Sequence, residues 1–274
     1  NYLVKSKKSY TPQNIGELKN DYDLFISGSD QVWSPRCVGF DPAYFLTFAD
    51  DKQKYSYAAS FAVPTLPDEF IDEYKKRLNG FQKFSVREPS GEKLVKELTG
   101  RTAETHLDPT LLISADEWKK IAVSKIDKPY ILIFTANPAV SLVDFALKLS
   151  KEKNLPVYCI NDAPHPVSHG INYIVAPTVE EFVGCFKNAE YVVTNSFHGT
   201  AFSVIFNKNL FVEFKNKSGR NIRSEGLLKS LGIDREIVDG NCNETEINWD
   251  IINAQLKTLG SKSKKYLSEI VNME

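Results

Sequence analysis

Short apolar runs alternate along the chain with longer segments in which apolar residues recur every three or four positions. The runs have the length of buried parallel strands and lie at 23–28, 84–88, 130–134, 156–160, 171–175, 191–194 and 210–214. The periodic segments predict helices over 66–81, 94–98, 142–149 and 178–186, and helices that begin near 198 and 224. This alternation predicts an α/β protein with parallel sheets and helices on both sheet faces.

Polar residues predict where several of these helices begin and end. Ser114 with Glu117, and Thr178 with Glu181, have the spacing of a capping box. Gly100 is placed to stop the helix that precedes it.

A break in the alternation predicts the domain organisation. Asp127-Lys128-Pro129 interrupts the pattern before a second series of strands and helices begins. We therefore predict two lobes, 1–112 and 113–274. The C-terminal helices, broken at Gly260-Ser261, fall in the second range but could pack on either lobe.

Composition and charge exclude several classes of protein. The chain has 274 residues, 42% of them hydrophobic, which is enough for substantial cores. Its 34 basic residues balance 35 acidic ones, so no whole-protein field favours nucleic acid or an anionic membrane. No segment has the roughly 20 consecutive apolar residues of a transmembrane helix. The four scattered cysteines have neither the spacing of a zinc site nor that of a disulfide framework, which predicts a cytoplasmic protein.

The strongest candidate site follows the strand at 191–194. Asn195-Ser196-Phe197-His198-Gly199-Thr200 connects this strand to a predicted helix, at the end of a parallel strand where α/β proteins bind ligands. Backbone N–H groups at a helix start favour an anion, Gly199 allows close approach, and His198 can transfer a proton. His198 could equally be a cap for its own helix.

A second strand end carries Gly28-Ser29-Asp30-Gln31-Val32-Trp33. Asp30 could accept hydrogen bonds from sugar hydroxyls or act as a base, and a helix cap or turn aspartate is the alternative. Trp33 is expected to pack in the core.

Basic residues follow two further strands. Arg87 ends the strand at 84–88 and could hold a carboxylate or phosphate, or instead pair with Glu88 or another surface acid. The basic stretch after 210–214 could form a phosphate clamp or a solvated loop; it comprises Lys215, Lys217, Arg220 and Arg223.

Two other sets of polar residues point to no function. Asp108, in Leu107-Asp108-Pro109-Thr110, reads as a cap or turn residue. Asp162, His165 and His169 lie in a proline-containing loop where we do not expect a metal.

Taken together and in order, four of these motifs resemble the polysaccharide pyruvyl transferase family. They are Gly28-Ser29-Asp30-Gln31-Val32-Trp33, Ser85-Val86-Arg87-Glu88, Leu107-Asp108-Pro109-Thr110 and Thr194-Asn195-Ser196-Phe197-His198-Gly199-Thr200. The resemblance implies a GT-B-like fold of two Rossmann-like lobes around a cleft. Family members begin with a strand and a glycine-containing loop upstream of the first motif, so the first lobe is expected to be incomplete.

The resemblance also implies the chemistry. A pyruvyl group would move from phosphoenolpyruvate to two hydroxyls of a saccharide or lipid-linked saccharide, forming a ketal during synthesis of bacterial surface polysaccharides. No metal or other cofactor is implied. The protein would lie in the cytoplasm or peripherally at the inner face of the membrane. The oligomeric state is not indicated.

Individual roles follow from matching positions in the motifs. Arg87 matches a donor-binding arginine and His198 the donor-site histidine, here the candidate acid, while Asp30 would orient or deprotonate the acceptor. Ser29, Gln31, Ser196 and Gly199 are predicted to line the substrate site. Better-studied members have arginine at the position of Ser196, so one anion contact is either missing here or supplied by Arg220 or Arg223.

Two other functions remain open at this stage. A GT-B-like glycosyltransferase using a nucleotide sugar would have the same fold. A non-catalytic homologue that binds a sugar or an anion is the second, because Ser196 departs from the motif.

Overall fold

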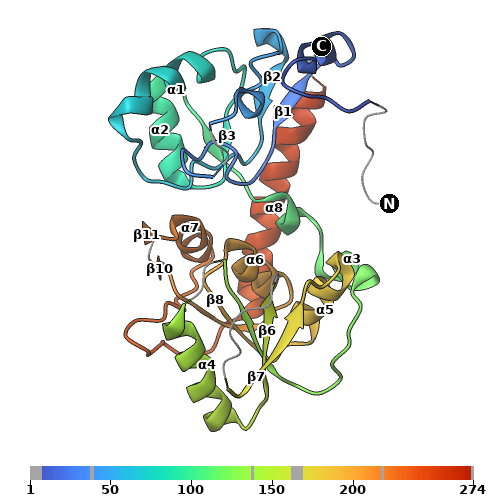
Figure 1. Cartoon of the computed structure of the whole chain (residues 1–274), viewed down its shortest axis with the longest axis vertical. Coiled ribbons are helices and arrows are strands. Elements are labelled where there is room, and N and C mark those ends of the chain that lie inside the picture. Colours follow the sequence, from blue (N-terminus) through green and yellow to red (C-terminus); the bar gives the residue numbers. More distant parts are fainter. Residues whose placement is uncertain (1–7, 38–39, 137–138, 162–168, 217–218, 273–274) are drawn as a thin grey trace. The chain divides into compact units, whose positions relative to one another are not determined.

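The computed structural model describes the chain except for residues 1–7, 38–39, 137–138, 162–168, 217–218 and 273–274 (Figure 1). The chain forms two compact units, one made of Asn1–Asp108 with Lys265–Glu274 and the other of Pro109–Lys264. Each unit contains parallel strands connected by helices, as the alternating pattern predicts.

Parallel strands form the centre of the first unit. Strand β1 (Phe25–Ser27) pairs with β2 (Lys54–Ser56), and β3 (Ser85–Val86) pairs with β4 (Glu104–Thr105). A parallel bridge between Ala59 and Val86 links the two pairs, which gives the order β1-β2-β3-β4. The helices are η1 (Ile15–Asn20), η2 (Pro42–Phe45), η3 (Asp51–Gln53), η4 (Asp68–Phe70), α1 (Ile71–Leu78) and α2 (Pro89–Thr99).

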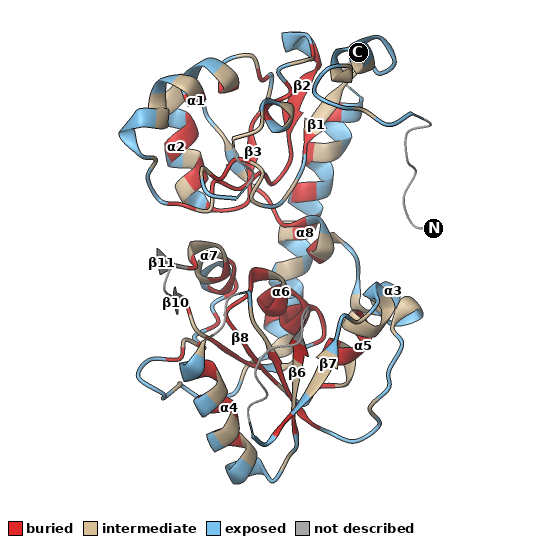
Figure 2. Ribbon diagram, in the orientation of Figure 1, coloured by how far each residue is buried: buried red, intermediate tan, exposed pale blue. Residues whose placement is uncertain are grey.

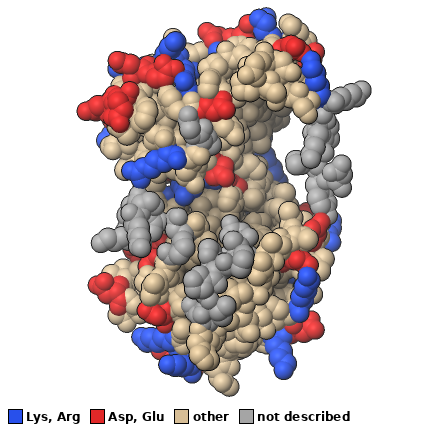
Figure 3. Space-filling model, in the orientation of Figure 1, with Lys and Arg blue, Asp and Glu red and all other residues tan. Residues whose placement is uncertain are grey.

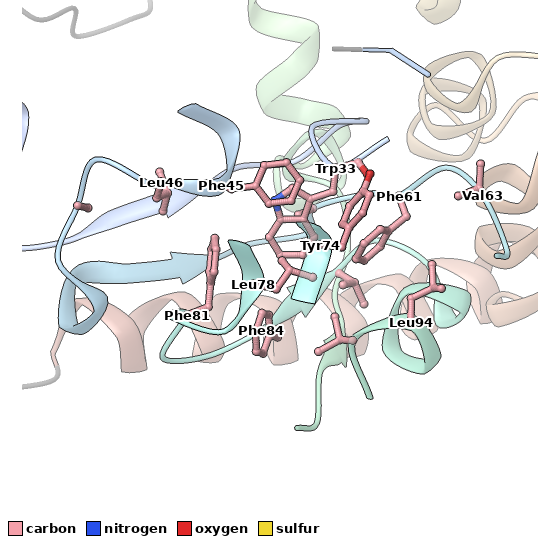
Figure 4. Packing of buried hydrophobic residues seen from close by; sticks show 14 residues of the cluster. Trp33, Phe45, Leu46, Phe61, Val63, Tyr74, Leu78, Phe81, Phe84 and Leu94 are labelled. Carbon is pink, nitrogen blue, oxygen red and sulfur yellow. The ribbon is translucent and has the colours of Figure 1, made fainter. Parts of the chain in front are cut away.

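An aromatic cluster around Trp33 fills the core of the first unit (Figure 4). The Trp33 ring is fully buried and lies 5.3 Å from Phe61 and 5.4 Å from Phe81, measured between ring centroids. Tyr74 of α1 enters the same cluster, and its hydroxyl donates to the Trp33 carbonyl at 2.6 Å. This arrangement confirms that Trp33 is a core residue.

The second unit contains a five-stranded parallel sheet. Its strands are β5 (Ile131–Phe134), β6 (Val157–Asn161), β7 (Ile171–Val175), β8 (Tyr191–Thr194) and β9 (Asn209–Val212). Their order is β7-β6-β5-β8-β9, so the chain starts in the middle, runs to one edge, and returns to build the other half. The order therefore reverses between β5 and β8, the switch point at which doubly wound sheets bind ligands.

Helices pack on this sheet because its strand residues alternate between two apolar faces. Phe211 of β9 meets Phe145 of α4 (Val140–Lys153) at 5.1 Å between ring centroids, in a cluster that also holds Ile131 and Ile133 of β5. Phe134 instead meets Phe182 of α5 (Val179–Asn188) at 5.1 Å. Figure 2 shows that β8 is largely buried, that the edge strand β7 is mostly intermediate or exposed, and that the outer faces of the helices are exposed.

The rest of the second unit surrounds this sheet. It comprises η5 (Pro109–Leu112), α3 (Ala115–Ile121), α6 (Phe197–Ile205), the hairpin of β10 (Lys215–Asn216) with β11 (Gly219–Arg220), α7 (Ile222–Ser230) and most of α8 (Trp249–Val271). No described helix is both long and apolar enough to cross a membrane. On the described face in Figure 3, acidic and basic side chains are interspersed.

Helix ends follow the sequence signals with one difference. The capping box of Thr178 and Glu181 starts α5, and Gly100 ends α2 in a left-handed conformation at φ 73°. Ser114 caps α3 by accepting the N–H of Glu117, whereas the Glu117 carboxylate pairs with Lys120.

The predicted break at Gly260-Ser261 is wrong, because α8 is continuous from Trp249 to Val271. One glycine costs a helix only about 1 kcal/mol relative to alanine, and the Ser261 hydroxyl bonds the Lys257 carbonyl within the same helix. The end of α8 belongs to the first unit, where the Tyr266 hydroxyl donates to the Ser56 carbonyl at 3.0 Å. The compact units thus divide after Asp108 and again within α8, rather than once after residue 112.

Two glycines inside helices predict opposite effects of alanine on stability. A Cβ at Gly184 of α5 would lie 1.9 Å from the Val123 carbonyl oxygen, whereas one at Gly260 of α8 meets nothing within 4 Å. Gly184→Ala should lower the free energy of unfolding by about 1–3 kcal/mol. Gly260→Ala should raise it by about 0.5–1 kcal/mol through helix propensity. Urea denaturation followed by circular dichroism measures both, and shifts of the same sign would contradict the packing described.

Candidate functional site

The loop after β8 lies at the switch point and is tied to the end of β5. The Thr194 hydroxyl donates to the Phe134 carbonyl at 2.5 Å, and the Asn195 side-chain oxygen accepts the N–H of Ala136 at 2.9 Å. These bonds satisfy backbone groups that have left the strand ladder. They also fix where α6 begins.

Gly199 is required for a different reason from the one that its sequence position suggested. A Cβ at this residue would lie 2.2 Å from the Thr194 hydroxyl oxygen and 3.2 Å from the Phe134 ring. Glycine therefore lets α6 start tightly against β8, as the third glycine of a dinucleotide-binding motif does. The close approach is made by protein, and no ligand is needed to explain it.

Ser196 also has a structural role. It is the N-cap of α6, where its hydroxyl oxygen accepts the N–H of Gly199 at 3.5 Å, and it is 6% exposed. Serine is a favoured N-cap because its oxygen replaces a missing carbonyl partner. The hydroxyl that we predicted to bind substrate is therefore directed into the start of its own helix.

A second helix, α7, begins beside α6 and is joined to it by buried hydrogen bonds. Its N-cap Asn221 donates from the amide nitrogen to the Asn195 carbonyl at 3.0 Å and to the Ser224 hydroxyl at 2.9 Å. The Thr200 hydroxyl of α6 lies 3.1 Å from the Ser224 hydroxyl of α7. The network is neutral and buried, and it holds two helix N-termini side by side.

His198 and Arg223 are each the second residue of one of these two helices. Both are half-buried, and the His198 ring lies edge-on to Phe197, 5.5 Å between centroids. The positive ends of two helix dipoles and a guanidinium therefore occur together with an imidazole in this unit. Such a site can hold an anion and donate a proton.

The basic stretch after β9 forms a short antiparallel hairpin. Lys215 pairs with Arg220 across β10 and β11, and the Asn221 N–H then donates to the Phe214 carbonyl at 2.6 Å before α7 begins. Arg220 is the last residue of β11 and directly precedes Asn221, the N-cap of α7. Lys217 lies outside the described residues.

In the first unit, the predicted residues Ser29, Asp30 and Arg87 meet at the ends of β1 and β3. Arg87 donates from Nη1 to Asp108 at 2.8 Å and from Nη2 to Asp30 at 3.1 Å, while the Ser29 hydroxyl donates to the same oxygen of Asp108 at 2.7 Å. The alternative that Arg87 pairs with an acid is therefore confirmed, with Asp30 and Asp108 as the partners. Glu88 is buried and accepts bonds from Ser60 and from backbone N–H groups.

Asp30 is the exposed end of this cluster. Its side chain is 59% exposed, against 1% for Arg87 and 4% for Asp108. Its backbone has φ 85°, a left-handed conformation that is rare for a residue other than glycine. Beside it, the Gln31 side-chain oxygen accepts a weak hydrogen bond from the Cys37 thiol. Asp30 is thus an ion-paired loop residue and not a helix cap.

Sequence reasoning missed Asp108 and His106 as members of the first unit's polar framework. His106 is buried, bonds the Ser85 hydroxyl at 2.8 Å and packs on the Tyr266 ring at 4.5 Å. Asp108 follows a short strand, just as the predicted site residues do. Its position at a strand end could therefore have identified it as a member of the cluster. No pattern in the sequence links Tyr266 to His106.

Among the residues that the structure describes, no group of three His, Cys, Asp or Glu side chains could hold a metal ion. His169 is exposed, and Asp162 and His165 lie outside the described part of the chain.

The fold places the chain among α/β proteins with a GT-B-like architecture. UDP-GlcNAc 2-epimerase from Methanocaldococcus jannaschii is similar, with a TM-score of 0.52 and 14% identity over 91% of this chain and 76% of that one. UDP-GlcNAc 2-epimerase from Neisseria meningitidis, solved bound to UDP-GlcNAc, has a TM-score of 0.51 and 11% identity over 96% and 74%. No curated protein matches the chain in sequence.

The sequence itself gives the family. A family model for polysaccharide pyruvyl transferases matches residues 1–212, and the chain belongs to that family. The match contains all four motifs, including the ion-paired cluster of the first unit and the start of α6.

The α6–α7 network predicts a specific effect of removing the Asn221 side chain. Asn221→Ala leaves buried partners unsatisfied and should lower the free energy of unfolding by about 1–3 kcal/mol. Asn241→Ala, at an exposed asparagine, is the matched control and should change it by less than about 0.5 kcal/mol. Hydrogen exchange should quicken at the first turns of α6 and α7 in the Asn221 variant. Unchanged exchange there would show that the network does not hold these helix starts.

Proposed function

We propose that the protein transfers a pyruvyl group from phosphoenolpyruvate to two hydroxyls of a sugar, forming a ketal and releasing phosphate. Family membership supports a polysaccharide-modifying transferase. The observation that carries the proposal is the pairing of the α6 and α7 N-termini at the switch point, each with His198 or Arg223 in its first turn. Phosphoenolpyruvate has a carboxylate and a phosphate, the groups that helix N-termini and arginine bind.

His198 is the proposed acid. It would protonate the methylene carbon of the donor, which becomes the methyl group of pyruvyl and leaves an oxocarbenium-like centre at the neighbouring carbon. A sugar hydroxyl adds there and loses its proton to a base, for which Asp30 is the candidate. The second hydroxyl then replaces the phosphate and completes the ketal. The protons released by the two hydroxyls balance the one taken up by carbon and the one carried off with phosphate.

The scheme requires no cofactor beyond the donor substrate. We propose a saccharide or lipid-linked saccharide as acceptor, in the biosynthesis of bacterial surface polysaccharides. The free thiols of all four cysteines fit a reducing compartment, the cytoplasm, and the inner face of the membrane is the site expected for a lipid-linked acceptor.

Donor binding tests the proposal. A ligand that binds only the folded state adds about 2.7 kcal/mol of stability at 100 times its Kd. Phosphoenolpyruvate should therefore raise the melting temperature, whereas UDP-GlcNAc should not. The reverse result would favour a nucleotide-sugar transferase, and no response to either compound would argue against both.

Replacing His198 tests the catalytic step. Loss of a general acid lowers turnover by about 10²- to 10⁴-fold, so His198→Ala should largely abolish acceptor-dependent phosphate release while the protein stays folded. His169→Ala removes an exposed histidine and is the matched control, expected to keep full activity. Undiminished phosphate release by the His198 variant would remove this residue from the mechanism.

A further inference from the structure

Arg87 lies at the centre of a chain of charged hydrogen bonds at the strand ends of the first unit. These hydrogen bonds link the Ser29 hydroxyl to Asp108, Asp108 to Arg87, and Arg87 to Asp30. Three of the four family motifs contribute to them. These hydrogen bonds therefore explain why the three motifs carry these residue types, although the motifs lie far apart along the sequence.

The residues in this series of hydrogen bonds differ in exposure. Arg87 and Asp108 are almost fully buried, so their ion pair has lost most of its hydration and depends on both partners being present. Asp30 carries the exposed carboxylate. Both terminal nitrogens of Arg87 already donate to carboxylates. A donor carboxylate would have to displace one of them.

The charges of these three side chains also disfavour the donor. Two carboxylates surround one guanidinium, and an exposed carboxylate repels a doubly negative molecule. A carboxylate is, however, a strong acceptor for the hydroxyl groups of a sugar. The cluster thus suits a polyhydroxyl substrate rather than phosphoenolpyruvate.

The backbone holds Asp30 in place from the other side. Its carbonyl accepts the N–H of Ser60 at 2.9 Å, and the Trp33 N–H donates to the Ser60 carbonyl at 3.2 Å. These bonds maintain the left-handed conformation at φ 85°. A residue kept in such a conformation by its surroundings is characteristic of functional loops.

We propose that Arg87 is a positioning residue, which holds the Asp30 carboxylate toward a hydroxyl of the acceptor sugar, and that it does not bind phosphoenolpyruvate. This inference rests on the proposed function. It departs from the donor-binding role that the family resemblance implied for Arg87. Asp108 is the buried support of Arg87 and, through it, of Asp30.

Separate measurements on the two substrates test this role. We expect Arg87→Lys and Asp108→Asn to lower kcat/KM for the acceptor about tenfold or more, because a fork-shaped contact is lost or weakened. The melting-temperature rise with phosphoenolpyruvate, titrated to obtain Kd, should stay within about twofold of the parent value. Asp30→Asn keeps the buried pair and should show the same separation with normal stability. Asp116→Asn, at an exposed aspartate of α3, is the charge-matched control.

The outcomes separate this inference from the proposed function. If the parent protein neither binds phosphoenolpyruvate nor releases phosphate, the proposed function fails and the role of Arg87 fails with it. If the parent protein binds the donor but Arg87→Lys, folded by circular dichroism, weakens that binding about tenfold with an unchanged acceptor KM, only the positioning role is overturned. If Arg87→Lys does not fold, Asp30→Asn decides, because weakened donor binding in that variant would contradict the repulsion argued above.

Discussion

Parallel strands β3, β4 and β8 each end where the chain leaves the strand ladder while still buried. Polar backbone groups at such a strand end must find partners inside the protein, because water does not reach them. In the second unit the partners are the neutral side chains of Thr194, Asn195, Ser196 and Asn221. Without them, α6 and α7 could not begin against the sheet, and neither His198 nor Arg223 would have a fixed position.

In the first unit, charged side chains rather than neutral ones join the strand ends. Its strand ends are joined by the ion pairs of Arg87 with Asp108 and Asp30. This choice gives the two units different chemistry. The first turn of α6 holds no acidic residue, so its positive end suits an anion, whereas the carboxylates of the first unit suit hydroxyl groups.

The sequence predicted what depends on local pattern. Strands 171–175 and 191–194 lie where the apolar runs predicted them, and the Thr178 capping box is present. Prediction from the sequence failed where segments that are distant along the chain meet. Arg87 is separated from Asp30 and Asp108 by whole strand–helix units, and periodicity does not say which strand ends become neighbours. The continuous α8 was missed because one glycine weakens a helix without ending it.

These strand ends also show what the family motifs record. Many motif residues have a role inside the protein, where they hold strand ends or helix starts: Ser29, Arg87, Asp108, Ser196 and Thr200 through their side chains, and Gly199 through its lack of one. Asp30 is exposed, and the other motif residues with polar side chains that are only partly buried are Ser29, Gln31, Thr110 and His198. A motif match therefore reports mainly the architecture of the sheet edge. Substrate preference must be set by the few accessible residues, and by Arg223, which lies outside the motifs but shares the edge with His198.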